Sequence, residues 1–169
     1  LDALTRAGRG VIGVGKISDI FGGRGLTQSL GVNESNTDGM AKTLKLLDED
    51  FTGLAFVNLV DGDMIYGHRR DIPGYARAMQ EFDDWLTTFL PRMHADDVLM
   101  VTADHGCDPG AEGTDHTREY VPLLVFGNHI APVNLGTYPT FAMIGATIAD
   151  MFHVSLTTAG ESFLPRILK

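Results

Sequence analysis

The chain has 169 residues, of which 44% are hydrophobic, so it is long enough to form one domain with a hydrophobic core. Its net charge is -9 and its Lys and Arg residues form no run, which argues against a nucleic-acid partner because such partners need clustered cations. No apolar run approaches the roughly 20 residues that span a bilayer, so we expect no membrane partner either.

The first third of the chain predicts a strand, a loop and a helix. The short apolar run Val11–Val14 contains β-branched residues and is typical of a buried strand. Glycines and then the polar stretch Gln28–Asn36 predict a loop. Thr37 or Asp38 is expected to cap a helix that runs to Leu47.

The middle of the chain contains a second strand and the clearest helix. Leu54–Val60 is almost entirely apolar, as expected for a strand covered on both faces. Pro73 is predicted to open a helix and Pro91 to end it. Its apolar residues recur at helical spacing: Tyr75, Met79, Phe82, Leu86 and Phe89.

The remaining elements predict the fold class. Val98–Thr102 and Val121–Phe126 are expected to be strands, and a last helix is expected after Pro139. Strands that alternate with helices indicate an α/β sandwich, with a mainly parallel sheet between helices. No repeat or low-complexity segment divides the chain, so we interpret residues 1–169 as one unit.

Polar side chains cluster at the ends of the predicted strands. Asp61-Gly62-Asp63 begins a segment that follows the second strand and reaches His68, and Asp104-His105 follows the third. A third cluster with His116 precedes the fourth strand. Ligand sites of α/β sheets gather beyond the carboxyl ends of the strands, so we expect these groups to converge. Asp and His together suit Zn, Mn or Fe.

These clusters resemble the metal-binding motifs of the alkaline phosphatase superfamily, and within it they are closest to the phosphopentomutase family. The resemblance covers almost the whole chain, and the spacing of five residues from Asp63 to His68 also favours this family. The matching stretches are Val14-Gly15-Lys16-Ile17-Ser18-Asp19-Ile20, Gly67-His68-Arg69-Arg70-Asp71, Thr102-Ala103-Asp104-His105-Gly106-Cys107-Asp108-Pro109 and Gly113-Thr114-Asp115-His116-Thr117-Arg118-Glu119.

The resemblance implies an alkaline-phosphatase-like fold with two divalent metal ions, usually Mn²⁺. One ion would be bound by Asp63, His68 and His116. The other would be bound by Asp104 and His105, together with an Asp from an N-terminal strand. Two such cations can stabilise both the attacking and the leaving oxygen of a phosphoryl transfer.

The implied reaction interconverts ribose or deoxyribose 1-phosphate and 5-phosphate, as part of nucleoside catabolism, through a phosphorylated Thr and a sugar bisphosphate. The chain departs from the family because the N-terminal strand, the Thr nucleophile and most of the cap domain are absent from it. We therefore expect it to be the C-terminal portion of the catalytic core, inactive by itself and prone to self-association through exposed sheet edges. Thr102, Thr114 and Thr117 are interpreted as structural.

Several charged residues near these motifs have more than one interpretation. Lys16 and Arg118 are candidate substrate-binding residues, although each can also be an ordinary surface cation. Arg69 and Arg70 are expected to pair with neighbouring carboxylates such as Asp71. Two further acidic residues, Asp61 and Asp115, are expected to orient a histidine.

Cys107 is the single cysteine, so no disulfide forms within the chain, which fits a cytoplasmic location. No motif assigns a base to it, and we interpret it as a small packed residue.

The motifs leave two alternative interpretations, an enzyme of the same superfamily with another substrate and a nucleotide-binding protein. A metal-dependent phosphoglycerate mutase or a phosphodiesterase of the same superfamily would keep the metals and change the substrate. A P-loop nucleotide site is suggested by the glycines before Lys16, but Ile17 stands where that motif needs Ser or Thr.

Overall fold

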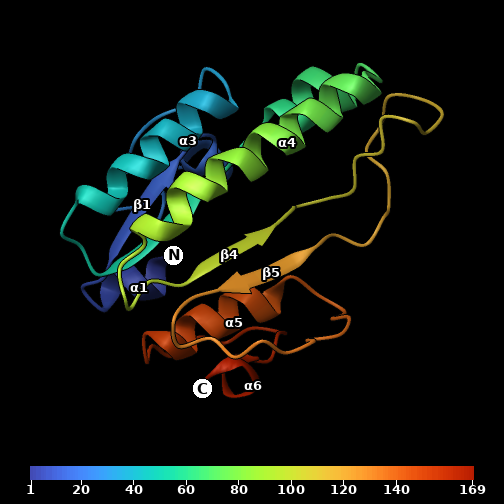
Figure 1. The fold of residues 1–169 in the computed structure, drawn as a ribbon. Coiled ribbons are helices and arrows are strands. Elements are labelled where there is room, and N and C mark those ends of the chain that lie inside the picture. Colours follow the sequence, from blue (N-terminus) through green and yellow to red (C-terminus); the bar gives the residue numbers. More distant parts are fainter.

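The computed structural model describes residues 1–169, and its strands form two separate sheets (Figure 1). The first sheet is parallel, with β1 (Gly10–Val14) between β2 (Gln28–Ser29) and β3 (Gly53–Val57). Four of the five residues of β1 are buried, as expected for the central strand of a covered sheet. The predicted α/β class, with a parallel sheet and helices, is confirmed.

The two strands predicted in this sheet are confirmed, and each begins one residue earlier than predicted. β3 ends at Val57, three residues before the predicted end. The reason is that the carbonyl oxygen of Val60 accepts the backbone N–H of Met64, so the chain has already turned into a helical segment. β2 lies within the stretch predicted as a loop, and its two residues are exposed.

The second sheet is an antiparallel pair formed by β4 (Leu99–Thr102) and β5 (Leu123–Phe126). Both strands were predicted, but not their direction relative to each other. In the register of this pair, the last residue of β4, Thr102, lies opposite the first residue of β5, Leu123. The segment after β4 and the segment before β5 therefore meet at the same end of the sheet.

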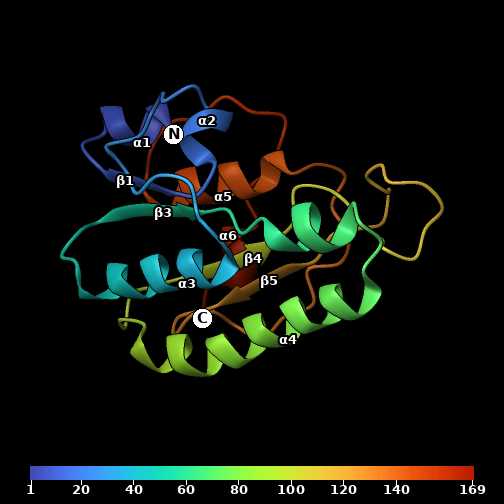
Figure 2. The same cartoon turned by 90° about the horizontal axis from the view of Figure 1, so that it is seen from above.

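The two longest predicted helices are confirmed, with different caps. α3 (Asn36–Lys45) is capped by Ser35, whose hydroxyl accepts the Asp38 N–H, rather than by Thr37 or Asp38. α4 (Ile72–Phe89) ends two residues before Pro91. The two helices lie on one side of the parallel sheet (Figure 2).

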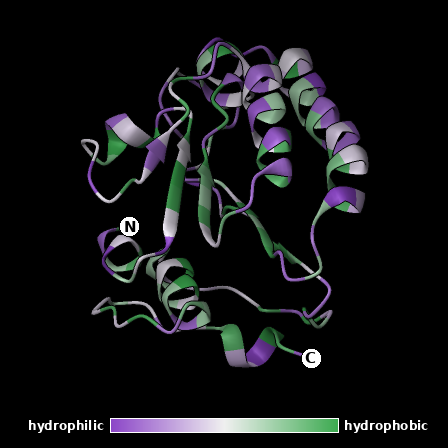
Figure 3. Cartoon of the chain, turned by 90° about the vertical axis from the view of Figure 1, so that its left-hand side faces the viewer, coloured by the Kyte–Doolittle hydropathy of each residue, from purple (hydrophilic) through white to green (hydrophobic).

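The apolar side chains form two separate cores. A small core under the parallel sheet contains Ile12, Val14 and Leu46. A larger core packs α5 (Ala142–Met151) and α6 (Leu164–Ile167) against one face of the β4–β5 pair. Figure 3 shows the matching pattern, with strongly hydrophobic strands and helices that carry one hydrophilic and one hydrophobic side.

Several short elements were not predicted, since each has too few residues for a periodic pattern. The unpredicted elements are α1 (Asp2–Arg6), α2 (Ile17–Ile20), α6, the π-helix η2 (Gly62–Gly67) and the 3₁₀ turns η1 (Leu46–Asp48) and η3 (Leu90–Arg92).

No helix of the structure combines the length and the apolar character needed to cross a membrane.

Candidate metal centre

The π-helix η2 carries the first candidate ligands directly after β3. Asp63 lies in its first turn, and the backbone N–H of His68 donates to the Asp63 carbonyl oxygen at 3.0 Å. In an α-helix, five residues advance about 500°, which would leave the two side chains roughly 140° apart around the axis. The i→i+5 hydrogen bonding of a π-turn brings them back to one face. The π-turn thus explains how Asp63 and His68, five residues apart, can present their side chains on one face.

A second pair of segments meets η2 from the other sheet. Gly106 and Thr117 form an antiparallel bridge, in which the Thr117 N–H donates to the Gly106 carbonyl oxygen at 3.1 Å. The Thr117 hydroxyl accepts the Asp108 N–H at 2.7 Å and donates to a Glu119 carboxylate oxygen at 2.5 Å. This bridge holds the loop after β4 against the loop before β5. As a result, the His105 and His116 rings stack with centroids 3.7 Å apart.

Three of the five predicted ligands form one tight group. The donor atoms of Asp63, His68 and His116 all lie within 4.8 Å of one another. The Asp63 Oδ1 atom lies 3.2 Å from His68 Nε2 and 3.3 Å from His116 Nε2. Two ligands that bind one cation at about 2.0–2.2 Å in tetrahedral geometry lie about 3.4 Å apart, which matches the two distances from Asp63, so Asp63 can share one metal ion with these histidines.

The orientation of His68 also suits metal binding. Its Nδ1 makes a short contact with the carbonyl oxygen of Thr114, so a proton on Nδ1 can be donated to that oxygen. The Nε2 atom is then left with its lone pair facing the group. A histidine held by its second nitrogen in this way is the usual arrangement at metal sites.

The other two predicted ligands lie beside this group but outside it. His105 stacks on His116, and its Nε2 lies 3.6 Å from an Asp104 carboxylate oxygen. The Asp104 side chain is 72% exposed. Asp104 and His105 thus provide two adjacent donors that could hold a second ion with at least one further ligand.

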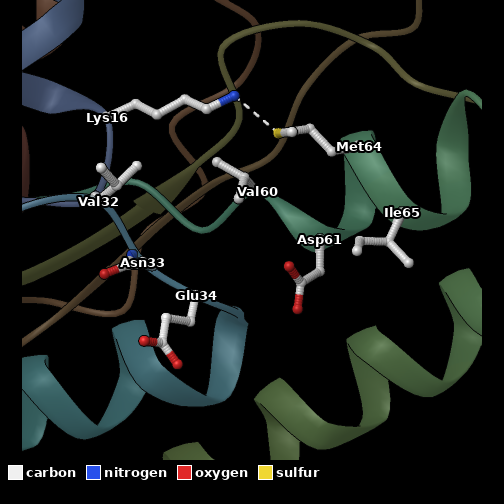
Figure 4. Close-up of a pocket in the computed structure, with 9 residues that line it drawn as sticks. Lys16, Val32, Asn33, Glu34, Val60, Asp61, Met64 and Ile65 are labelled. Carbon is white, nitrogen blue, oxygen red and sulfur yellow. Dashed lines mark hydrogen bonds between the residues drawn. The ribbon is translucent and has the colours of Figure 1, made fainter.

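Lys16 lines a pocket of about 150 Å³ at the carboxyl ends of β1 and β3 (Figure 4). Its ammonium nitrogen lies 2.8 Å from the sulfur of Met64, on the π-helix that also carries Asp63. The same pocket is lined by Asp61 and Glu34. Lys16 is therefore a half-buried residue whose ammonium reaches the π-helix that also carries Asp63.

Two of the three arginines, Arg69 and Arg70, differ from their predicted roles. Arg69 and Arg70 are exposed and make no ion pair, whereas we expected them to pair with carboxylates such as Asp71. Asp71 instead accepts the Gly74 N–H at the start of α4 and lies 4.0 Å from Arg77. Arg118 is likewise exposed and makes no ion pair.

Asp61 does not contact a histidine, so the prediction for this residue is wrong. Its Oδ2 accepts the backbone N–H of Asn36 at 2.7 Å, and its own N–H donates to the Asn36 side chain at 3.0 Å. Asn36 is buried, and this reciprocal pair ties the start of α3 to the start of η2. No local pattern indicates this pair, because the two residues are 25 positions apart.

Cys107 packs against η2 and contacts a predicted ligand. Its thiol donates to Asp63 Oδ1 at 3.6 Å. Burial, followed by the hydrogen bond to Asp63 and the nearby negative charge, raises the pKa of the Cys107 thiol above its ordinary value. Burial and the same cluster of negative charge raise the pKa of the neighbouring Tyr75 phenol.

The chain matches the Metalloenzyme superfamily over residues 11–156. It belongs to that superfamily. Among its relatives are phosphopentomutases from Lachnoclostridium phytofermentans (51% identical), Acetivibrio thermocellus (52%) and Symbiobacterium thermophilum (54%). These alignments cover 99–100% of the chain but only 43% of each relative. The chain thus spans less than half the length of these superfamily members.

A solved structure of a protein from Pyrococcus horikoshii has a similar fold. The TM-score is 0.53 at 21% identity, over 73% of this chain and 39% of that one. At this identity the likeness concerns the fold alone.

Proposed function

We propose that this chain is the metal-binding C-terminal part of a phosphopentomutase. The full-length enzyme would interconvert ribose or deoxyribose 1-phosphate and 5-phosphate. The observation that carries the proposal is the group of Asp63, His68 and His116, whose donor atoms all lie within 4.8 Å. Its support is the identity of more than 50% to proteins named phosphopentomutase, over essentially the whole chain.

The proposed cofactor is a pair of divalent cations, most simply Mn²⁺. Asp63, His68 and His116 would hold one of them, and Asp104 and His105 would contribute to the other with a carboxylate from outside these 169 residues. When bound, the pair would offset the charge of the phosphoryl group and of the oxygens that attack and leave. Carboxylate and imidazole donors accept Mn, Zn and Fe, so the preference has to be measured.

The substrate contacts proposed within this chain are Lys16 and Arg118. Lys16 lines a pocket that includes Asp61 and Met64, which lie close to Asp63 in the sequence, and its ammonium has only the weak Met64 thioether as a partner. An anionic phosphate would be a stronger partner for a half-buried cation than a thioether is. Arg118 follows His116 by two residues and has a free guanidinium that suits bidentate phosphate binding.

None of the threonines near the candidate ligands has a hydroxyl positioned to act as the nucleophile. The Thr117 hydroxyl is bonded to both Asp108 and Glu119, and Thr114 contributes its carbonyl oxygen to His68. Thr102 makes only a 3.4 Å contact with the next carbonyl oxygen. The phosphothreonine would therefore belong to a part of the enzyme outside this chain, and the chain by itself would be inactive.

The enzyme would act in nucleoside catabolism in the cytoplasm, on a pentose phosphate and without a nucleic-acid or membrane partner. The isolated chain would self-associate, because β4 has an unpaired edge and Leu124 and Phe126 of β5 are exposed. Size-exclusion chromatography with light scattering at several concentrations measures this.

A mutase assay of the full-length protein tests the activity. After EDTA treatment, ribose 1-phosphate should be converted to ribose 5-phosphate only when Mn²⁺ is restored, and deoxyribose 1-phosphate should be tested in parallel. The isolated 169 residues should give no turnover while keeping an α/β circular dichroism spectrum. Turnover of phosphoglycerate but not of pentose phosphate would replace this proposal with a phosphoglycerate mutase.

A further inference from the structure

The Cys107 thiol lies where the two sheets of the molecule contribute to one site. Its Sγ donates to Asp63 Oδ1 at 3.6 Å, although the two residues are 44 positions apart. Cys107 follows β4, whereas Asp63 belongs to the π-helix after β3. This hydrogen bond thus joins the segments that supply the two sets of candidate ligands.

The oxygen that accepts the thiol is the one that faces both histidines. Asp63 Oδ1 lies 3.2 Å from His68 Nε2 and 3.3 Å from His116 Nε2. Rotation of the carboxylate would carry this oxygen out of the group. The Cys107 thiol donates to this oxygen and is not itself a member of the metal group.

The packing around the sulfur leaves little room for movement. Gly67, the last residue of η2, is buried, and a Cβ at this position would overlap the Cys107 sulfur. The sulfur therefore sits directly against the backbone of the π-helix. Any shift of Cys107 would move either the π-helix or the loop that carries Asp104 and His105.

We infer that Cys107 is a positioning residue that sets the orientation of Asp63 for metal binding. The inference rests on the proposed function, since it concerns the same metal group. Side chains that hold metal ligands by hydrogen bonds commonly change metal affinity by about 10–100-fold when they are removed. A residue that only fills space would change stability without changing affinity.

Isothermal titration of the metal-free full-length protein with MnCl₂ tests the inference. Cys107→Ala should weaken Mn²⁺ binding by about tenfold, whereas Cys107→Ser, which keeps a donor, should stay within about threefold of wild type. The matched control is Ser162→Ala, which also removes a donor to a carboxylate, that of Asp150, but far from the site. This control should bind Mn²⁺ like wild type.

The outcomes separate the inference from the proposed function. Equal affinity of wild type, Cys107→Ala and Cys107→Ser would overturn the positioning role while leaving the metal site intact. Absence of Mn²⁺ binding by wild type would overturn the metal site, and the inference with it. In an Asp63→Asn background, Cys107→Ala should cause no further loss; a full additional loss would also overturn the inference. If Cys107→Ala does not fold, the Mn²⁺ affinities of Cys107→Ser, which keeps a donor, and Cys107→Val, which removes it, are compared instead. Equal affinities of these two variants would then overturn the positioning role.

Discussion

The two regions that build the candidate site use different means to place their ligands. In the first region, the π-helix after β3 places Asp63 and His68 through its own backbone hydrogen bonds. In the second region, His105 and His116 come from irregular loops that depend on the Gly106–Thr117 bridge. Local geometry is thus decisive on one side of the site, and tertiary contact on the other. Substitutions in the two regions should therefore change metal affinity and stability in different ways.

The largest effect is expected where the two regions meet. His116→Ala removes the only member of the three-residue group that comes from the second region. We expect Mn²⁺ affinity to fall by more than about a hundredfold, because loss of a direct ligand exceeds the cost of losing a supporting hydrogen bond. Calorimetric titration checks this, with the exposed His94→Ala as control. Unchanged affinity would remove His116 from the site.

A smaller effect is expected from crowding the contact between the regions. Gly67→Ala places a methyl group on the Cys107 sulfur, so η2 must shift. Overpacking of this kind costs about 1–3 kcal/mol, and Mn²⁺ affinity should fall as well. Urea unfolding and metal titration measure both. Gly145→Ala in α5, where a Cβ meets only Leu156 at 4.0 Å, is the control that should not be destabilised.

The second region alone can be loosened by Thr117→Val. The substitution keeps the β-branched shape but loses the bonds to Asp108 and Glu119. We expect a stability loss of about 1–2 kcal/mol in urea unfolding, with a modest fall in metal affinity. Thr43→Val, which also loses a hydroxyl bond but within α3, serves as control. If metal affinity were unchanged, the bridge backbone would suffice to hold the loops.

The smallest effect is expected outside both regions, in α3. The hydrogen bond from Lys42, followed by that from the Glu34 N–H, lowers the pKa of Asp38 below its ordinary 3.8. A lowered pKa stabilises the fold above the ordinary value, and this stabilisation is lost as the pH falls through the lowered value. Asp38→Asn should therefore lower the urea midpoint slightly at pH 7 and not below about pH 3. Asp83→Asn is the exposed control.

The elements that could be predicted from the sequence are those long enough to show a clear pattern of apolar residues. The apolar runs in β1 and β3 and the periodic apolar positions of α4 were sufficient. The α3 cap was placed wrongly because Ser35, Thr37 and Asp38 are all good caps, and only the observed hydrogen bond distinguishes them. The π-helix was missed because it has six residues.

The ligands were named from their resemblance to a family, and the structure brings them to one place for a reason that the sequence did not reveal. A parallel fourth strand would begin at the opposite edge of the sheet, far from Asp104. The antiparallel pairing of Thr102 with Leu123 instead returns His116 to that end. The Cys107 and Asn36 contacts join segments 44 and 25 positions apart, which no local pattern can indicate.

The hairpin-like course of β4 and β5 has a consequence for engineering. Both ends of the connection are fixed, by the Thr102–Leu123 register and by the Gly106–Thr117 bridge, and the ligands lie beside these fixed points. Gly110, Glu112 and Gly113 are exposed at the far end of the connection. A peptide tag or a fluorophore attachment sequence spliced in after Ala111 should therefore report on the site from close range without displacing its histidines.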